Sequence, residues 1–407
     1  MGARERLVPL VVALLVVSAG CAGVGSVGGL GNVLGGGPGT SGGAHVVWTA
    51  HPVPQNGTLT YRSAGARRIG GTTYVVAPLG SNVRNCTLVA MNGTGGTLWR
   101  HDVTDQGGRC RAQDVATPLV TSLAGRPTVI VAMKDRLHAF DARTGAPRFA
   151  VRLPSDAFTA PVVLGGSTPL VVYPAMKGTV YAVHPNGTVA WRRHLHSIAT
   201  GEQPQVVHPA HGPPLVVVGG ANSVAAFRPN GSVAWRRNVS ARFLRAGRVG
   251  GRPVLVAAAE HHVSALYANG TTAWTHRTNA SMTVGAVGPP RRGAAPLAYV
   301  TDDGGTALAY YASNGTLAWR HPLEGHRRYV PPAALASLGG GDARQVVVGT
   351  VNGRVRVLNA TTGVAVGGYH RKGSLWTRPT VYRTADGRER VALTYEDGTV
   401  VALSYGP

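Results

Sequence analysis

Short apolar runs separated by glycine-rich polar turns fill the chain from about residue 45 to its last residues. The segment Phe158–Leu195 shows one complete unit of this pattern. Its four strand-like runs are Thr159–Leu164, Pro169–Pro174, Thr179–Val183 and Thr188–Leu195. The second run has little alternation of apolar and polar residues, which predicts a strand buried on both faces. Four such antiparallel strands in about 40 residues are typical of one β-propeller blade.

The fourth run of each unit carries the most regular signal, an Asn-Gly-type turn followed by a short strand and an aromatic residue. The copies NGTVAW, NGSVAW, NGTTAW and NGTLAW end at Trp191, Trp235, Trp274 and Trp319. Weaker copies end at Tyr61, Trp99, Phe149 and Gly367. The ends lie 38 to 50 residues apart, a period that indicates a propeller or solenoid array. This count predicts eight blades, with seven as the alternative if a weak repeat is irregular.

The two ends of the chain predict how the ring closes. The chain finishes with three runs and no fourth: Pro379–Arg383, Arg390–Tyr395 and Thr399–Ser404. An orphan fourth-strand motif, Thr58–Arg62, lies near the other end, and His45–Thr49 is either an extra strand or the true closing strand. Pairing of N- and C-terminal strands predicts an all-β, eight-bladed propeller of four-stranded antiparallel blades.

The repeated aromatic residue is predicted to pack between neighbouring blades, where its apolar face is buried and an indole N–H can reach a backbone carbonyl. The residues assigned to this position are Tyr61, Trp99, Phe149, Trp191, Trp235, Trp274 and Trp319. An arginine follows directly in four copies, and alternation along a strand turns it to the opposite, outer side. These arginines are candidate anion-binding residues: Arg100, Arg192, Arg236 and Arg320. The alternative is that their charge only protects the edge strands from pairing with other chains.

Residues 1–20 are predicted to be a signal peptide. A short basic stretch precedes the 11-residue apolar run Leu7–Val17, which is too short to span a bilayer comfortably. The segment Ser18–Cys21 resembles the lipobox of prokaryotic lipoproteins, although an aliphatic residue is usual where Ser18 stands. The resemblance implies that Cys21 carries the lipid; a secreted soluble protein and an uncleaved anchor are the alternatives.

Residues 21–44 are predicted to form the lipidated end and a glycine-rich tether, and residues 45–407 the propeller. The 23 residues after Cys21 have too little apolar surface to order themselves, and they would reach roughly 25 Å. The predicted location is the cell membrane, with the lipid-anchored propeller on the extracytoplasmic face.

The remaining cysteines and the sequons fit such a location. Cys86 and Cys110 are a candidate disulfide, because pairs persist outside the cell; two free buried thiols are the alternative. Ten Asn-x-Ser/Thr sequons occur, and turn chemistry alone explains the six that contain Asn-Gly. The other four are candidate glycosylation sites: Asn85, Asn238, Asn279 and Asn359.

The chain is strongly basic, with 40 Lys and Arg against 17 Asp and Glu and a net charge of +23. Such a charge favours anionic partners, although a genome-wide arginine bias or an acidic setting would also produce it. The arginines are spread over the repeats and no nucleic-acid-reading motif is visible. The predicted partners are therefore a membrane, through the lipid, and an envelope protein or anionic polysaccharide, with no specific nucleic acid.

Two segments resemble the PQQ-like (quinoprotein-like) repeat, written loosely as A-x-D-x-x-T-G-x-x-x-W. They are AFDARTGAPRF at Ala139–Phe149 and VLNATTGVAVG at Val357–Gly367. The resemblance covers roughly Ala44–Pro407 and implies a β-propeller, most similar to the BamB-like lipoprotein branch. The family also includes alcohol dehydrogenases that bind pyrroloquinoline quinone and Ca²⁺.

The enzyme branch implies residues that this chain lacks. It uses an adjacent Cys-Cys pair, whereas Cys86 and Cys110 are far apart in sequence, and Ca²⁺ requires oxygen ligands that 17 acidic residues supply sparsely. No catalytic residue, metal site or cofactor is therefore predicted. The expected function is a non-catalytic binding or scaffold module for envelope proteins or anionic glycans. The alternatives are a quinone-dependent oxidoreductase and a propeller-type extracellular hydrolase or lyase.

Overall fold

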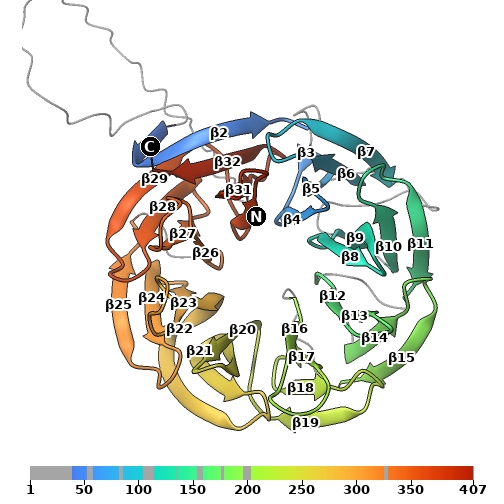
Figure 1. Cartoon of the computed structure of the whole chain (residues 1–407). Helices are drawn as coiled ribbons and strands as arrows, with labels where there is room; N and C mark the ends of the chain where they lie inside the picture. The colour runs from blue at the N-terminus through green and yellow to red at the C-terminus, as the bar shows by residue number, and fades with distance from the viewer. Residues whose placement is uncertain are drawn as a thin grey trace, which may run out of the picture. The chain divides into compact units, whose positions relative to one another are not determined.

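The computed structural model describes residues 39–52, 58–81, 86–103, 114–133, 135–153, 159–175, 178–195, 203–324 and 329–406. They form a ring of small β-sheets arranged around a central axis (Figure 1), within one compact unit, Gly37–Pro407. No α-helix occurs in these ranges, and hence no helix there could cross a membrane. The predicted signal peptide, Cys21, Asn85 and Cys110 lie outside the described residues.

The strands pair into seven antiparallel sheets, which we divide into repeats 1 to 8 in chain order. Repeat 1 has β4 (Gly65–Ile69), β5 (Thr72–Ser81), β6 (Cys86–Met91) and β7 (Thr97–Val103), with β3 (Thr58–Leu59) also on β5. Repeat 2 has β8 (Leu119–Leu123), β9 (Arg126–Met133), β10 (Arg136–Asp141) and β11 (Pro147–Arg152). Repeat 3 has β12 (Val162–Leu164), β13 (Leu170–Pro174), β14 (Thr179–Val183) and β15 (Val189–His194). Repeat 4 has β16 (Gln205–Val207), β17 (Leu215–Gly219), β18 (Val224–Phe227) and β19 (Val233–Arg237).

The second half of the ring contains a shared sheet and the first and last described strands. The six-stranded sheet has β20 (Phe243–Val249), β21 (Arg252–Tyr267), β22 (Thr272–Gly288), β23 (Leu297–Asp302), β24 (Thr306–Tyr311) and β25 (Leu317–Pro322). Repeat 7 has β26 (Ala334–Ala336), β27 (Gln345–Gly349), β28 (Arg354–Asn359) and β29 (Ala365–His370), with β1 (Gly39–Gly42) on its edge. Repeat 8 has β30 (Thr380–Arg383), β31 (Glu389–Thr394), β32 (Val400–Tyr405) and β2 (Ala44–Ala50).

The six-stranded sheet contains two consecutive repeats, repeats 5 and 6. The eight repeats therefore form only seven sheets. The first arm of β21 pairs with β20, and its second arm pairs with β22. Between the arms, His261 has a left-handed backbone (φ 62°). The strand β22 then pairs with β21 up to Ser281 and with β23 from Met282 onward, so one continuous strand links repeats 5 and 6. The predicted all-β propeller is confirmed, as seven hydrogen-bonded sheets.

The N- and C-terminal strands close the ring, but the N-terminal partner is not the orphan motif. The strand β2 pairs with β32, so the closing strand comes from His45–Thr49. The expected closing run Thr58–Arg62 instead begins with β3, which pairs with β5. The reason is the aromatic residue: Trp48 is 9% exposed and donates its indole N–H to the Gly93 carbonyl at 3.0 Å. Tyr61 is half-buried, and in the closing sheet it is Trp48 that makes the repeated contact, with its ring over the turn at Gly95.

The repeated tryptophans fasten each repeat to the next. Each indole N–H donates to a backbone carbonyl of the neighbouring repeat: Trp99 to Ala142, Trp191 to Pro229, Trp235 to Ala268, Trp274 to Ala312 and Trp319 to Ala360. The ring of each tryptophan covers the turn glycine of that repeat, and Phe149 lies over Gly187 in the same way. Gly367 takes the aromatic place in repeat 7, where β1 pairs along the strand.

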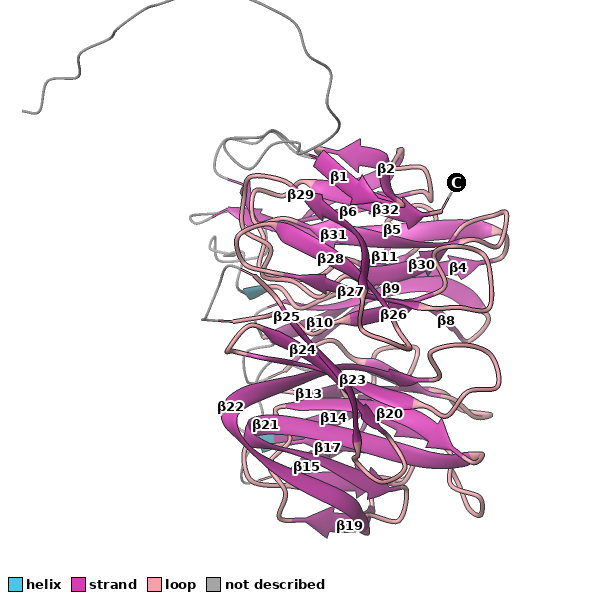
Figure 2. Cartoon of the chain, turned by 90° about the vertical axis from the view of Figure 1, so that its left-hand side faces the viewer, coloured by secondary structure: helices cyan, strands magenta, loops and turns pink. Residues whose placement is uncertain are grey.

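Apolar cores fill the spaces between neighbouring sheets. One core joins Val76 and Leu88 of repeat 1 to Val129 and Val131 of repeat 2, and similar clusters follow around the ring. The strand β13 is buried along its whole length. Seen from the side, the strands run between two faces that carry the turns and loops (Figure 2). The rigid sheets therefore present two loop-bearing faces and one axial opening.

Candidate functional site: an axial arginine pocket

Seven repeats line a pocket of about 370 Å³, through their innermost strands or the residues just before these strands, and we call it the axial pocket. Its polar lining includes Arg62 of repeat 1, Gln203 before β16, Arg245 of β20 and Arg378 before β30. These residues are separated by up to 316 positions in the chain, and only closure of the ring brings them to one place.

Glycines let the innermost strands approach closely around this pocket. A Cβ added at Gly65 would lie 1.9 Å from the carbonyl oxygen of Pro118. A Cβ at Gly285 would lie 2.1 Å from the carbonyl oxygen of Ala333. Backbone therefore packs on backbone between neighbouring repeats at these two positions.

Each of the three arginines is held by a carbonyl of an adjacent repeat. The Nε–H of Arg62 donates to Val115 at 3.2 Å, that of Arg245 to Gly285 at 3.0 Å, and that of Arg378 to Ala333 at 3.2 Å. The three carbonyl groups that accept these hydrogen bonds belong to repeats 2, 6 and 7. All three side chains are half-buried, so their guanidinium groups have fixed positions in the lining.

The charge of the pocket is one-sided. Three guanidinium groups face it, and among its described lining residues there is no Asp or Glu. A concave site lined by charge of one sign concentrates counter-ions, and the planar guanidinium fork matches carboxylate and phosphate oxygens. The lining also offers the hydroxyls of Ser63, Thr117 and Thr380, and no histidine stands among its described residues. The arrangement can therefore hold an anion, and the described lining contains no acid–base pair.

The side chains that line the axial pocket do not fit the Ca²⁺ ion and the quinone that the quinoprotein enzymes bind. Ca²⁺ takes six to eight oxygen ligands, mostly carboxylates and carbonyls, and no carboxylate lies among the described lining residues. Within the ranges the structure describes, no three His, Cys, Asp or Glu side chains are grouped to hold a metal ion. The carboxylates of Asp302 and Asp303 instead accept hydrogen bonds from the backbone N–H groups of Thr306 and Ser281.

The four arginines predicted to bind anions lie on the rim, not in the pocket. They occupy the outermost strands of four repeats, and all are exposed: Arg100, Arg192, Arg236 and Arg320. The structure spreads them around the circumference and brings no two of them together. Arg100 pairs with Asp102 at 3.1 Å, a contact so exposed that it contributes little stability.

The position after these arginines has an interface role that sequence reasoning missed. Arg193 donates its Nε–H to the Gly231 carbonyl, and Arg237 to the Gly270 carbonyl, both at 2.8 Å. A ring nitrogen of His276 lies 2.7 Å from the Gly315 carbonyl. The signal was present in the alternation of the strand, because a residue two places after the tryptophan faces the same side as its ring.

The cysteine and the sequons occupy varied environments. Cys86 is buried in β6 and disulfide-bonded, and its pairing with Cys110 stays a prediction. Asn238 and Asn279 are exposed. The Oδ1 of Asn359 accepts hydrogen bonds from two backbone N–H groups, so this sequon is a turn residue despite its missing glycine.

Comparison with known proteins agrees with this architecture. A family model described as outer membrane protein assembly factor BamB matches residues 84–175 and 176–329, together more than half of the chain. The structure of BamB from Moraxella catarrhalis is 18% identical, with a TM-score of 0.64 over 89% of this chain and 98% of that chain. No curated protein matches the chain by sequence.

Redox enzymes share the fold as well. Quinohemoprotein alcohol dehydrogenase ADHIIG from Pseudomonas putida HK5 is 14% identical, with a TM-score of 0.64 over 90% of this chain and 76% of that chain. A europium-containing methanol dehydrogenase is 12% identical, with a TM-score of 0.60 over 89% of this chain and 93% of that chain. At these identities the likeness shows the fold alone. The match of the family model decides the family, and the chain belongs to the PQQ-like β-propeller family represented by BamB.

Proposed function

We propose that this propeller is a non-catalytic scaffold of the cell envelope that holds an acidic segment of a partner protein at its axial pocket. The observation that carries the proposal is the lining itself: Arg62, Arg245 and Arg378 with no described carboxylate among them. Each guanidinium is already positioned by a neighbouring repeat, so little side-chain entropy is lost when an anion binds.

The family supports the envelope setting. The model that matches the chain is named for an outer membrane protein assembly factor, and we extend only the envelope location and the scaffold role to this protein. Lipidation of Cys21 would tether the ring through the glycine-rich segment, leaving its faces accessible to partners. The net charge of +23 would draw acidic partners toward the ring.

A labelled polyglutamate peptide tests the pocket directly by fluorescence anisotropy at low ionic strength. The variant Arg245→Gln with Arg378→Gln removes two pocket charges. The control, Arg192→Gln with Arg320→Gln, removes two charges from the exposed rim. Hydrogen bonds to charged groups contribute about 1.5–3 kcal/mol each, so we expect at least a tenfold loss of affinity in the pocket variant.

The outcomes separate the proposal from its competitors. Equal loss in both variants would mean that binding follows net charge and not the pocket. Tighter binding of an acidic polysaccharide than of polyglutamate would show that the axial pocket binds a glycan and not a protein segment. Dye reduction that depends on added pyrroloquinoline quinone and Ca²⁺ would contradict the non-catalytic role.

A further inference from the structure

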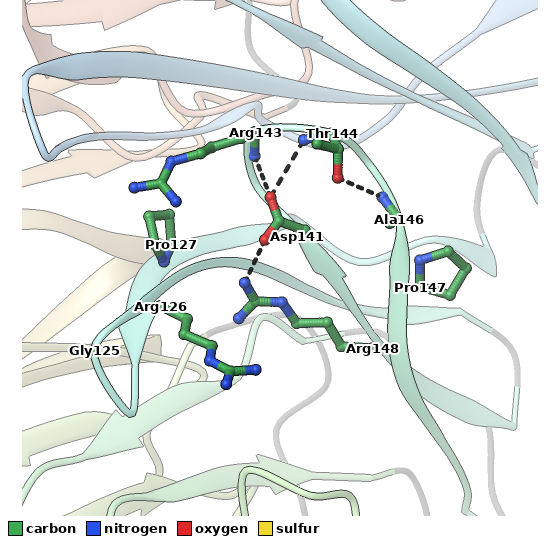
Figure 3. Close-up of a pocket in the computed structure, with 9 residues that line it drawn as sticks. All are labelled: Gly125, Arg126, Pro127, Asp141, Arg143, Thr144, Ala146, Pro147 and Arg148. Carbon is green, nitrogen blue, oxygen red and sulfur yellow. Dashed lines mark hydrogen bonds and ion pairs between the residues drawn. The ribbon is translucent and has the colours of Figure 1, made fainter.

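A second concave site lies on repeat 2, away from the axis, where two turns meet. Arg126 is the first residue of β9, and Asp141 is the last residue of β10. Arg143 lies in the turn that follows β10, and Arg148 lies in β11. Together with Pro127 and their neighbours these residues line an open hollow of about 510 Å³ (Figure 3). We call it the repeat-2 pocket. Three guanidinium groups and one carboxylate leave it with a surplus of two positive charges.

Asp141 is fully engaged in building the site. Its carboxylate accepts hydrogen bonds from the backbone N–H groups of Arg143 at 2.8 Å and Thr144 at 3.3 Å, and it pairs with Arg148 at 2.5 Å. Burial raises the pKa of Asp141, but the hydrogen bonds from these donors outweigh it and hold the pKa below its ordinary value. The residue therefore stays ionised and keeps the turn and Arg148 in place.

Arg148 is fixed from two sides. One Nη donates to Thr128 Oγ1 at 2.7 Å and the other reaches Asp141, and the side chain is 21% exposed. In contrast, the guanidinium groups of Arg126 and Arg143 have no hydrogen-bond or ion-pair partner among the described residues. In Figure 3 the Arg126 guanidinium lies in the hollow beneath that of Arg148, and Arg143 extends over Pro127.

We propose that the repeat-2 pocket binds a tetrahedral oxyanion, a phosphate or phosphate-ester group. Two uncommitted guanidinium forks beside a fixed third one provide the planar, paired donors that such an anion accepts. The anion would also offset the mutual repulsion of three positive groups gathered around a single carboxylate. An open hollow of this size leaves room for the sugar or other group that carries an ester.

The other repeats show that this cluster is not a general feature of the turn. Repeat 5 has the same Gly-Arg-Pro sequence at Gly251–Pro253. It places Tyr267 where repeat 2 has Asp141, and Ala273 where repeat 2 has Arg148. Arg252 is therefore an arginine at the matching turn without the rest of the site, which makes it a control within the same molecule.

Titration calorimetry of the full-length chain at low ionic strength tests the proposal, with inorganic phosphate and glucose 6-phosphate as the two probes. We expect the variant Arg126→Gln with Arg143→Gln to bind at least tenfold more weakly than the parent protein. Arg252→Gln should bind as the parent does. Both altered side chains are exposed and unpaired among the described residues, and an unchanged unfolding temperature will confirm that the fold survives.

A complementary variant acts in the opposite direction. Asp141→Asn keeps an oxygen for the turn, as Asn359 does at the equivalent place in repeat 7, and removes the competing negative charge. The substitution also releases Arg148 from its ion pair, but Arg148 stays bonded to Thr128 Oγ1, so we expect phosphate to bind severalfold more tightly. Tighter binding of the ester than of inorganic phosphate would identify an ester as the ligand, and equal binding would identify the free ion.

Equal binding by the parent, the Arg126/Arg143 variant and the Arg252 variant would overturn the proposal, as would no phosphate binding by the parent. The site is independent of the axial pocket. Its failure would therefore leave polyglutamate binding unchanged, and the axial variants should bind phosphate at the repeat-2 pocket as the parent does.

Discussion

Replacing one turn glycine tests whether the tryptophan–glycine contacts hold the ring together. Gly270 has a left-handed backbone (φ 81°), and a Cβ placed there would lie 2.6 Å from the Trp235 ring. The indole cannot move aside easily, because its N–H donates to Ala268 at 2.7 Å and the side chain is 9% exposed. Gly270→Ala therefore combines backbone strain with a steric clash.

Gly387 is a matched control for the backbone strain alone. Its φ is 82°, and nothing lies within 4 Å of an added Cβ. Both glycines end the same kind of turn, donating to the carbonyl three residues earlier, at Tyr267 and Thr384. Left-handed backbone costs a residue with a Cβ about 1–2 kcal/mol, whereas overpacking costs about 1–3 kcal/mol. We expect Gly270→Ala to lose about 1–3 kcal/mol more free energy of unfolding than Gly387→Ala.

Urea unfolding followed by far-ultraviolet circular dichroism measures the difference without relying on tryptophan fluorescence. A double-mutant cycle with Trp235→Leu isolates the contact, because the smaller, flexible side chain can yield and the penalty of Gly270→Ala should shrink. Equal losses for Gly270→Ala and Gly387→Ala, or a penalty unchanged in the Trp235→Leu background, would refute the reasoning.

Three further predictions concern acid stability, the disulfide and the anchor. Burial raises the pKa of Asp397, but hydrogen bonds, chiefly from Arg371, hold it below its ordinary value. The stability this carboxylate contributes is therefore present above about pH 4 and is lost as the pH falls through the lower folded pKa. In Asp397→Asn, the free energy of unfolding should consequently decrease less steeply with falling pH than in the parent protein. Peptide mapping without reductant should find Cys86 joined to Cys110, and reduction should cost about 3 kcal/mol for a loop of this size; an unmodified Cys110 would contradict it. Cys21→Ala should move the protein from the membrane to the soluble fraction, and continued membrane retention would point to an uncleaved anchor.

The ring could be predicted because its information is local and repeated. A turn, a strand and a tryptophan recur at a steady spacing, and each copy makes the same contact with the next repeat, as Trp191 and Trp235 do. The count was harder to obtain, because β21 pairs with β20 along its first arm and with β22 along its second, and β22 continues from repeat 5 into repeat 6. The number of hydrogen-bonded sheets is consequently one lower than the number of sequence repeats.

The closing strand could not be chosen from the sequence. Both His45–Thr49 and Thr58–Arg62 are short runs that contain an aromatic residue. The choice depends on which one fits beside β32, a strand about 350 residues away, and on whether Trp48 can cover the turn at Gly95. Such a contact has no local signature.

The axial pocket was equally hidden. Arg62, Arg245 and Arg378 share no motif and differ in their place relative to the innermost strand. The arginines that do share a motif follow the tryptophans and face outward on the rim. Regular spacing therefore revealed residues with a common structural position, whereas the pocket residues converge only when the ring closes.

Site-specific photo-crosslinking at Ser63, in the wall of the axial pocket, tests the central claim most directly. A photoreactive residue is placed there in the membrane-bound protein, with the same residue at Arg252 as a control outside the pocket, and the crosslinked peptides are sequenced. The scaffold account predicts adducts at Ser63, absent from the control, with a protein segment rich in Asp and Glu. Adducts with neutral or basic segments, or the same adducts at both positions, would contradict it.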